Sequence, residues 1–250
     1  MRRAGAVVYC AAGSGLAADV SVLLVAADEA GKEAWAQDVQ SKLLATGAFA
    51  SVDIFDASSA TPALSVLQGY DVVLVWRVIM FASPSGVGDV LAQYWDGGGA
   101  VVVAVFATAG DSLQGLFGTA ANGYVLIDGT ANQEAPSDSL GSVLEPKSPL
   151  MAGVASISAT QAYRSTGAVI NGGAVVAQWA SNGRPLVVRG TRAGRPLVAV
   201  NMFPPSSNAE GGFWAGDGAV LMRNALLYSA CAPCAAGTFA TAGARPTGGA

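Results

Sequence analysis

The feature that most constrains the fold is a regular alternation of strand-length apolar runs with helix-like segments between residues 20 and 106. Four runs rich in Val, Leu and Ile occupy residues 21–26, 52–55, 72–76 and 100–106. Continuous apolar runs of this length are typical of strands that are covered on both faces, as in parallel sheets. The pattern therefore predicts a parallel sheet between two layers of helices.

Helices are expected in the intervening segments 32–45, 62–67 and 85–96, of which 62–67 is short. The first segment places Trp35, Val39 and Leu43 four residues apart, so that they share one face. In the third segment, Ser83 and Pro84 favour a helix start and Gly97 a helix end.

The pattern changes after residue 108. A short helix near 113–117, a strand over 124–127 and a polar loop over 128–148 are expected. Asn182-Gly183 predicts a hairpin between strands at 174–179 and 185–189, and a further strand follows at 196–201. A closing helix over 217–229 begins at Asp217, a favourable cap. Its Asn224 lies on the core face and is expected to be a buried amide bonded to a nearby loop.

The composition restricts the class of protein. Hydrophobic residues make up 52% of the 250 residues and charged residues 12%, but no run approaches the about 20 apolar residues of a membrane span. A net charge of −4 argues against a nucleic-acid partner. A local group of arginines is expected to keep strand edges and turns soluble, with an anion site as the alternative: Arg184, Arg189, Arg192 and Arg195.

Histidine is absent from the sequence, and the three cysteines are Cys10, Cys231 and Cys234. We therefore expect no catalytic triad, no metal site and no cofactor. The remaining candidates are polar residues at the carboxyl ends of the predicted strands, where open parallel sheets bind ligands. This candidate ligand-binding set is Asp28, Glu29, Asp56, Arg77, Thr108 and Asp111. The alternative role of these carboxylates is helix capping and solvation.

Four segments in this order resemble the class I glutamine-amidotransferase-like fold, in particular its trehalose-utilisation-type branch: 69–76, 94–102, 148–154 and 217–228. The resemblance implies a flavodoxin-like three-layer α/β sandwich over residues 20–230, with a mainly parallel sheet and an antiparallel C-terminal extension. Enzymes with this fold carry a nucleophilic cysteine after the fourth strand, with histidine and glutamate partners. The matching place here, residues 105–107, has no thiol or hydroxyl, and Ser148 stands where the family has a histidine.

The two ends of the chain differ from this central domain. Residues 1–19 resemble a leader or secretion signal. Residues 231–250 begin Cys231-Ala232-Pro233-Cys234 and resemble the start of an ephrin-receptor-type cysteine-rich repeat, or a disordered tail. The repeat implies that Cys231 and Cys234 form disulfides in a secreted or cell-surface protein. A redox pair, half a zinc site and a cytoplasmic location are the alternatives.

We therefore expect a non-catalytic amidotransferase-like domain of a secreted or cell-surface protein, with a binding or structural role and a carbohydrate or another protein as partner. A carboxylate-based hydrolase acting on a carbohydrate-like substrate is the alternative, because glycosidases need only two acids. The hydrolase requires the carboxylates after the strands to converge, with one shielded from water. A remnant of the fold without a ligand is a third interpretation. Among the tryptophans, Trp214 is the expected exposed aromatic residue.

Overall fold

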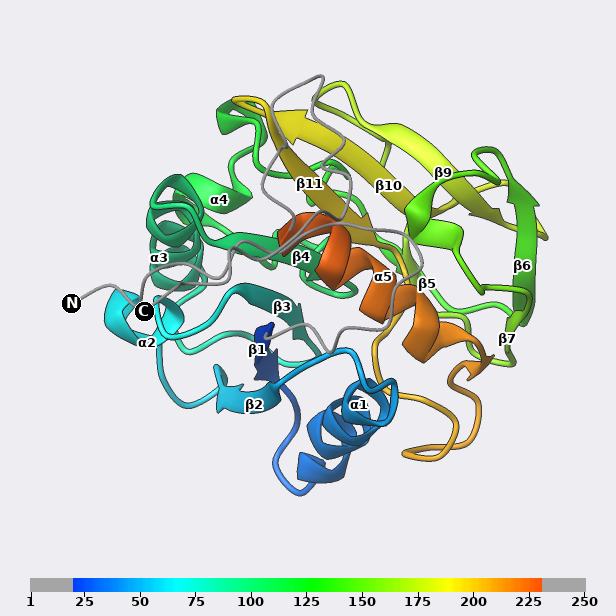
Figure 1. The fold of residues 1–250 in the computed structure, drawn as a ribbon, viewed down its shortest axis with the longest axis horizontal. Coiled ribbons are helices and arrows are strands. Elements are labelled where there is room, and N and C mark those ends of the chain that lie inside the picture. The colour runs from blue at the N-terminus through cyan, green and yellow to red at the C-terminus, as the bar shows by residue number, and fades with distance from the viewer. Residues whose placement is uncertain (1–19, 231–250) are drawn as a thin grey trace, which may run out of the picture.

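The computed structural model describes residues 20–230, which form a ten-stranded mixed sheet between helices (Figure 1). The strand order is β12-β7-β6-β9-β10-β11-β4-β3-β1-β2. The predictions for residues 1–19 and 231–250, including the disulfide of Cys231 and Cys234, lie outside the described residues.

The parallel half of the sheet runs β2-β1-β3-β4-β11, the strand order of flavodoxin-like folds. Its strands are β1 (Ser21–Ala27), β2 (Ser51–Asp56), β3 (Val72–Arg77), β4 (Ala100–Ala104) and β11 (Arg195–Val200). The four predicted apolar runs are thus confirmed as strands. The fourth ends two residues earlier than predicted, because the chain turns over residues 105–109.

The antiparallel arm extends this sheet beyond β11 (Figure 1). It contains β10 (Pro185–Arg192), β9 (Ala174–Trp179), β6 (Asp138–Val143), β7 (Ile157–Ala159) and β12 (Ala215–Gly216). A separate two-stranded sheet pairs β5 (Gln133–Glu134) with β8 (Arg164–Ser165). The predicted hairpin is confirmed, with Gly183 at a φ of 69° in its turn.

Two predictions for this arm are wrong. Residues 124–127 form no strand; only Ile127 makes an isolated bridge, to Val169. All four residues are nevertheless buried, so their apolar run reflects core packing and not strand pairing. Conversely, the segment 128–148 was expected to be a loop but contains β5 and β6. Leu140 and Val143 are the apolar residues of β6, which leaves too weak an alternation to recognise.

Helices cover both faces of the sheet, as predicted. On one face lie α1 (Glu33–Ala45) and α5 (Gly218–Ala230), and on the other α2 (Leu64–Leu67), α3 (Pro84–Asp96) and α4 (Gly115–Gly118). Short 3₁₀ helices are η1 (Ala120–Asn122) and η2 (Pro149–Met151). Alternate strand residues form two cores, with Leu24 packed under α1 and α5 and Leu23 under α3. Ser83 accepts a hydrogen bond from the Gly86 N–H at 3.1 Å and caps α3 as predicted.

The start of α5 differs from the prediction that Asp217 caps the helix. The Asp217 carboxylate does not cap the helix but accepts hydrogen bonds from the N–H groups of Ala155 (2.9 Å) and Ser156 (2.8 Å). Asn224, in contrast, behaves as predicted for a buried amide. Its Nδ2 donates to the carbonyls of Leu150 (3.1 Å) and Ala152 (2.8 Å) and so ties α5 to η2. Across residues 20–230, each helix is too short or too polar to span a bilayer.

Candidate functional site

The predicted ligand-binding residues lie at or after the carboxyl ends of the parallel strands. Asp28 follows β1 and Arg77 ends β3, on the two sides of the point where the strand order reverses. Trp76 Nε1 donates to Asp28 Oδ1 at 3.0 Å, and Trp76 belongs to the core under α1 and α5. Arg77 is in register with Ala27, whose side chain lies in the opposite core. Asp28 and Arg77 therefore point to opposite faces of the sheet.

Asp28 is the most perturbed of the predicted carboxylates. Burial raises its pKa from 3.8 to about 6; the hydrogen bond from Trp76 opposes this shift, and the nearby charge of Asp56 adds to it. Asp28 Oδ2 is buried and has no hydrogen-bond partner among the described residues. For the exposed Asp56, burial alone would raise the pKa, but hydrogen bonds from Ser58 and Ser59 outweigh it and lower the pKa. The two carboxylates thus differ in acidity although they influence each other.

The other four predicted residues contribute less. Desolvation lowers the pKa of Arg77, whose Nε is buried and unpartnered within residues 20–230. Thr108 is 5% exposed, and its Oγ1 is likewise unpartnered among these residues. Glu29 and Asp111 are exposed to solvent. Among the four carboxylates, Asp28 is shielded from water and lies close enough to Asp56 for that charge to affect its pKa, whereas Asp56, Glu29 and Asp111 are exposed.

An aromatic cluster packs around the turn after β4, where the resemblance places the nucleophile of the enzymes. Phe106 is its member within that turn. The cluster comprises Trp35, Phe106, Tyr163, Phe203 and Phe213. The Phe106 ring lies 5.3 Å from that of Tyr163 and 5.5 Å from that of Phe203, measured between centroids. These separations are typical of packed aromatic pairs. The turn after β4 is therefore part of the hydrophobic core.

The space beside this aromatic cluster is closed. The cavity lined by Tyr163, Phe203 and Phe213 has a volume of about 10 Å³, at the limit of what one water molecule needs. Trp214 lines the same cavity, and the expectation that it is exposed is wrong: it is 4% exposed. Its Nε1 donates to the carbonyl of Pro204 at 2.7 Å, which satisfies its one donor inside the protein.

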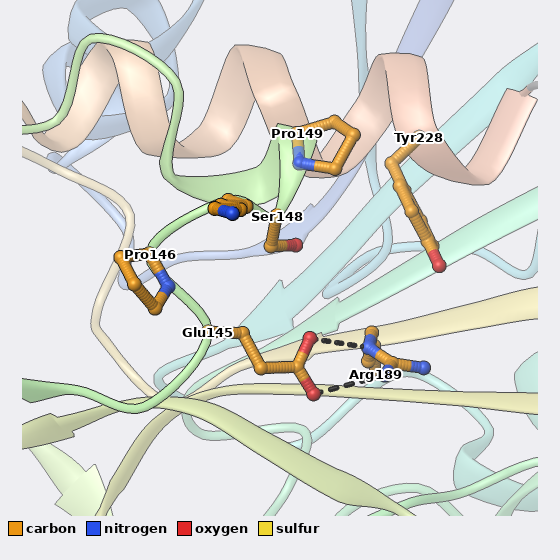
Figure 2. A pocket seen from close by; sticks show the side chains of 7 residues that line it. Glu145, Pro146, Ser148, Pro149, Arg189 and Tyr228 are labelled. Atoms are coloured by element: carbon orange, nitrogen blue, oxygen red, sulfur yellow. Dashed lines mark hydrogen bonds and ion pairs between the residues drawn. The ribbon is translucent and has the colours of Figure 1, made fainter.

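A larger pocket, not predicted from the sequence, opens between α5 and the segment 145–149 (Figure 2). Its volume is about 450 Å³, and its lining residues are Glu145, Pro146, Lys147, Ser148, Pro149, Arg189 and Tyr228. Figure 2 shows the Glu145 carboxylate facing the Arg189 guanidinium, with Tyr228 reaching from α5 toward Arg189. Arg189 donates from Nε to Oε2 at 2.7 Å and from Nη2 to Oε1 at 2.9 Å. Two of its residues carried a sequence signal: Ser148, at the place of the family histidine, and Arg189, one of the arginines with an anion site as the alternative role.

The arginine group that includes Arg189 is engaged throughout. Arg184 pairs with Glu134 at 2.9 Å and Arg192 with Asp96 at 2.9 Å, while Arg195 donates to backbone carbonyls next to α3. Arg184, Arg192 and Arg195 lie in or next to turns, whereas Arg189 lies within the inner strand β10 and lines the pocket. Within residues 20–230, no three acidic or thiol side chains lie close enough together to hold a metal ion.

Comparison with known proteins gives the fold. No family model and no curated protein matches the chain. Among solved structures, a ThuA-like protein of Parabacteroides merdae has a TM-score of 0.57 at 12% identity, covering 84% of this chain and 90% of that one. The fold is therefore ThuA-like. A ThuA-like protein of Bacteroides uniformis is also similar, with a TM-score of 0.49, 15% identity and 86% and 93% coverage. The similarity to the Parabacteroides merdae structure confirms the flavodoxin-like architecture predicted from the sequence.

Proposed function

We propose that this chain carries a non-catalytic amidotransferase-like domain that binds a small ligand or a partner. The observation that supports the proposal is the buried turn after β4. Val105, Phe106 and Ala107 are 0%, 6% and 3% exposed, and Phe106 packs inside the aromatic cluster. Nucleophilic catalysis on this fold needs an exposed thiol or hydroxyl on that turn and a base beside it. This turn offers neither, and the sequence has no histidine.

The test is incubation of the full chain with L-glutamine, with released ammonia measured over a day. We expect release no faster than in a protein-free control. Ammonia release that scales with protein concentration, and that is lost on heat denaturation, would overturn the proposal.

A carboxylate-based hydrolase acting on a carbohydrate-like substrate is the second candidate, and Asp28 supports it. Glycosidases use one protonated acid and one ionised carboxylate, and here the pKa of Asp28 is raised to about 6 while that of Asp56 is lowered. The assay is a panel of nitrophenyl glycosides at pH 5 to 7, with Asp28→Asn and Asp111→Asn compared with the unmodified chain. Cleavage by the unmodified chain and by Asp111→Asn that is lost in Asp28→Asn would replace the first proposal with this one. If none of the three proteins cleaves any glycoside, the first proposal, a non-catalytic binding domain, stands.

We also propose a secreted or cell-surface location, with a cytoplasmic one as the alternative. The support is the Cys231–Cys234 spacing and the leader-like residues 1–19. Mass spectrometry of protein from its native cells tests this proposal. A processed N-terminus and oxidised cysteines are expected, whereas an intact Met1 with free thiols would contradict it.

A further inference from the structure

We propose that the pocket between α5 and the segment 145–149 binds a small hydroxylated organic acid, meaning a compound with one carboxylate and neighbouring hydroxyl groups. The inference rests on the proposed function, because it names the ligand class of a domain without catalysis. The pocket shares no lining residue with the aromatic cluster, so the two can fail separately.

The size of the pocket suits such a ligand. Its volume of about 450 Å³ lies within the range of small-molecule sites, about 300–1,000 Å³. The cavity beside the aromatic cluster, about 10 Å³, admits no ligand of this size.

The charges of the pocket favour an anion. Glu145 and Arg189 form a two-bond ion pair and offset each other. Hydrogen bonds and charge from Glu145 raise the pKa of Arg189, with a smaller contribution from Tyr228, so the guanidinium stays ionised. Lys147 lines the same pocket and makes no ion pair within residues 20–230. The uncompensated charge at the pocket is therefore the Lys147 ammonium, which matches one carboxylate.

The remaining polar groups favour hydroxyls on the same ligand. Each oxygen of Glu145 keeps acceptor capacity beyond its bond to Arg189, and Arg189 keeps N–H donors on Nη1 and Nη2. The hydroxyls of Ser148 and Tyr228 both donate and accept. An inorganic dianion would offer no donor to the free acceptor sites of Glu145 and would be repelled by its charge. A hydroxylated monoanion satisfies both the carboxylate and the ammonium.

The pocket also has apolar surface for the carbon skeleton. Pro146, Pro149 and the ring of Tyr228 line it beside the polar groups, and Figure 2 shows the two prolines on the segment that faces Arg189. This combination of rigid apolar surface and a few polar groups is usual for small-molecule sites.

The experiment is a calorimetric titration of the full chain with D-glucuronate, and with D-glucose as the neutral match. We expect a dissociation constant of about 1 mM or tighter for glucuronate and at least about tenfold weaker binding of glucose. Lys147→Met should weaken glucuronate binding about tenfold or more, and Tyr228→Phe severalfold. Lys42→Met, which removes the same charge from α1, is the matched control and should bind like the unmodified chain.

Three outcomes would overturn the inference: no glucuronate binding in the millimolar range, equal affinity for glucose, or no effect of Lys147→Met. Spectra of the ligand recorded after each titration show whether it has been chemically changed, and so test the proposed function separately from binding. Binding with the ligand intact supports both. Chemical change of the ligand contradicts the non-catalytic function, while the affinities still decide the site.

Discussion

Replacing Asp138 with asparagine tests how the antiparallel arm is held together. The side chain of Arg164 on β8 is 0% exposed and that of Asp138 on β6 is 2% exposed. Arg164 Nη1 donates to Asp138, and Arg164 Nε donates to Glu134 at 2.7 Å. The Ser181 hydroxyl also donates to Asp138. One buried arginine thus joins β5, β6, β8 and the turn between β9 and β10.

The cost of the substitution follows from this geometry. Removing one partner of a buried ion pair destabilises a protein by about 3–5 kcal/mol, because the other charge stays buried. Glu134 still faces Arg164 in the variant, so we expect the lower end, about 3 kcal/mol at pH 7. Asparagine retains an acceptor oxygen for the N–H groups of Ser139 and Ser181, which limits the loss to the ion pair.

The stability lost should depend on pH. Burial alone would raise the pKa of Asp138, but hydrogen bonds from Ser181 and Arg164 outweigh it and lower the pKa from 3.8 to about 2. A depressed pKa means that the ionised carboxylate stabilises the fold above pH 4 and that this contribution is lost as the pH falls toward 2. The shift corresponds to about 2 kcal/mol.

The assay is urea unfolding of the unmodified chain, Asp138→Asn and the control Asp111→Asn at pH 7, 5, 4 and 2.5. The gap in unfolding free energy between the unmodified chain and Asp138→Asn should be about 3 kcal/mol at pH 7 and narrow by about 2 kcal/mol by pH 2.5. The exposed Asp111 should show almost no gap. A gap under about 0.5 kcal/mol at pH 7, or one that is constant from pH 7 to 2.5, would refute the reasoning.

Two further substitutions address the site edge and the helix layer. Burial raises the pKa of Asp28 to about 6, so between pH 4 and 6 the native state keeps a proton that the unfolded chain has released. The stability of the folded chain therefore falls as the pH rises from 4 to 6. Asp28→Asn should therefore unfold at higher urea than the unmodified chain at pH 7 but not at pH 4. Asp111→Asn, as the control, should show no such change. An Asp28→Asn protein that is less stable than the unmodified chain at pH 7 would contradict the burial of Asp28. In Gly88→Ala, the new Cβ would lie 1.7 Å from the Gln114 carbonyl oxygen, so α3 and α4 would have to move apart. Urea unfolding should show a loss of more than about 2 kcal/mol, against about 0.5 kcal/mol or less for Gly211→Ala, where the Cβ meets open space. Equal stabilities of the two variants would disprove the close approach of α3 and α4.

The parallel half could be predicted because its signals are local. Strands β1, β3 and β4 are almost entirely apolar runs, β2 is apolar apart from Asp53 and its ends, and the helix α3 has its cap at Ser83 and its apolar stripe in the sequence. Asn224 could be predicted for the same reason: an amide on the core face of a helix must find partners nearby, and the carbonyls of Leu150 and Ala152 supply them.

The arm and the site depend on contacts between distant residues, which no local pattern records. β6 is held by Asp138 and its bond to Arg164, 26 residues later, and not by an apolar alternation. In the sequence, Phe106 reads as the end of a strand and Phe213 as a loop residue; only the fold brings both beside Phe203. Within the ligand set predicted after the strands, the side chain of Arg77 lies on the opposite face from Asp28, because the pleat at the last strand residue decides the direction.

Asn224 also helps to shape the pocket between α5 and the segment 145–149, which is open, in contrast to the closed cavity beside the aromatic cluster. Aromatic side chains bury about 150–250 Å² each, so the aromatic cluster stabilises the carboxyl edge, and the cavity beside it is only about 10 Å³. The pocket, in contrast, is formed by Ser148 and Pro149 on one side and Tyr228 on the other. Asn224 lies one helical turn before Tyr228 and holds the carbonyls of Leu150 and Ala152. A single buried amide therefore fixes both walls of the pocket relative to each other, which is the preorganisation that a small polar ligand requires.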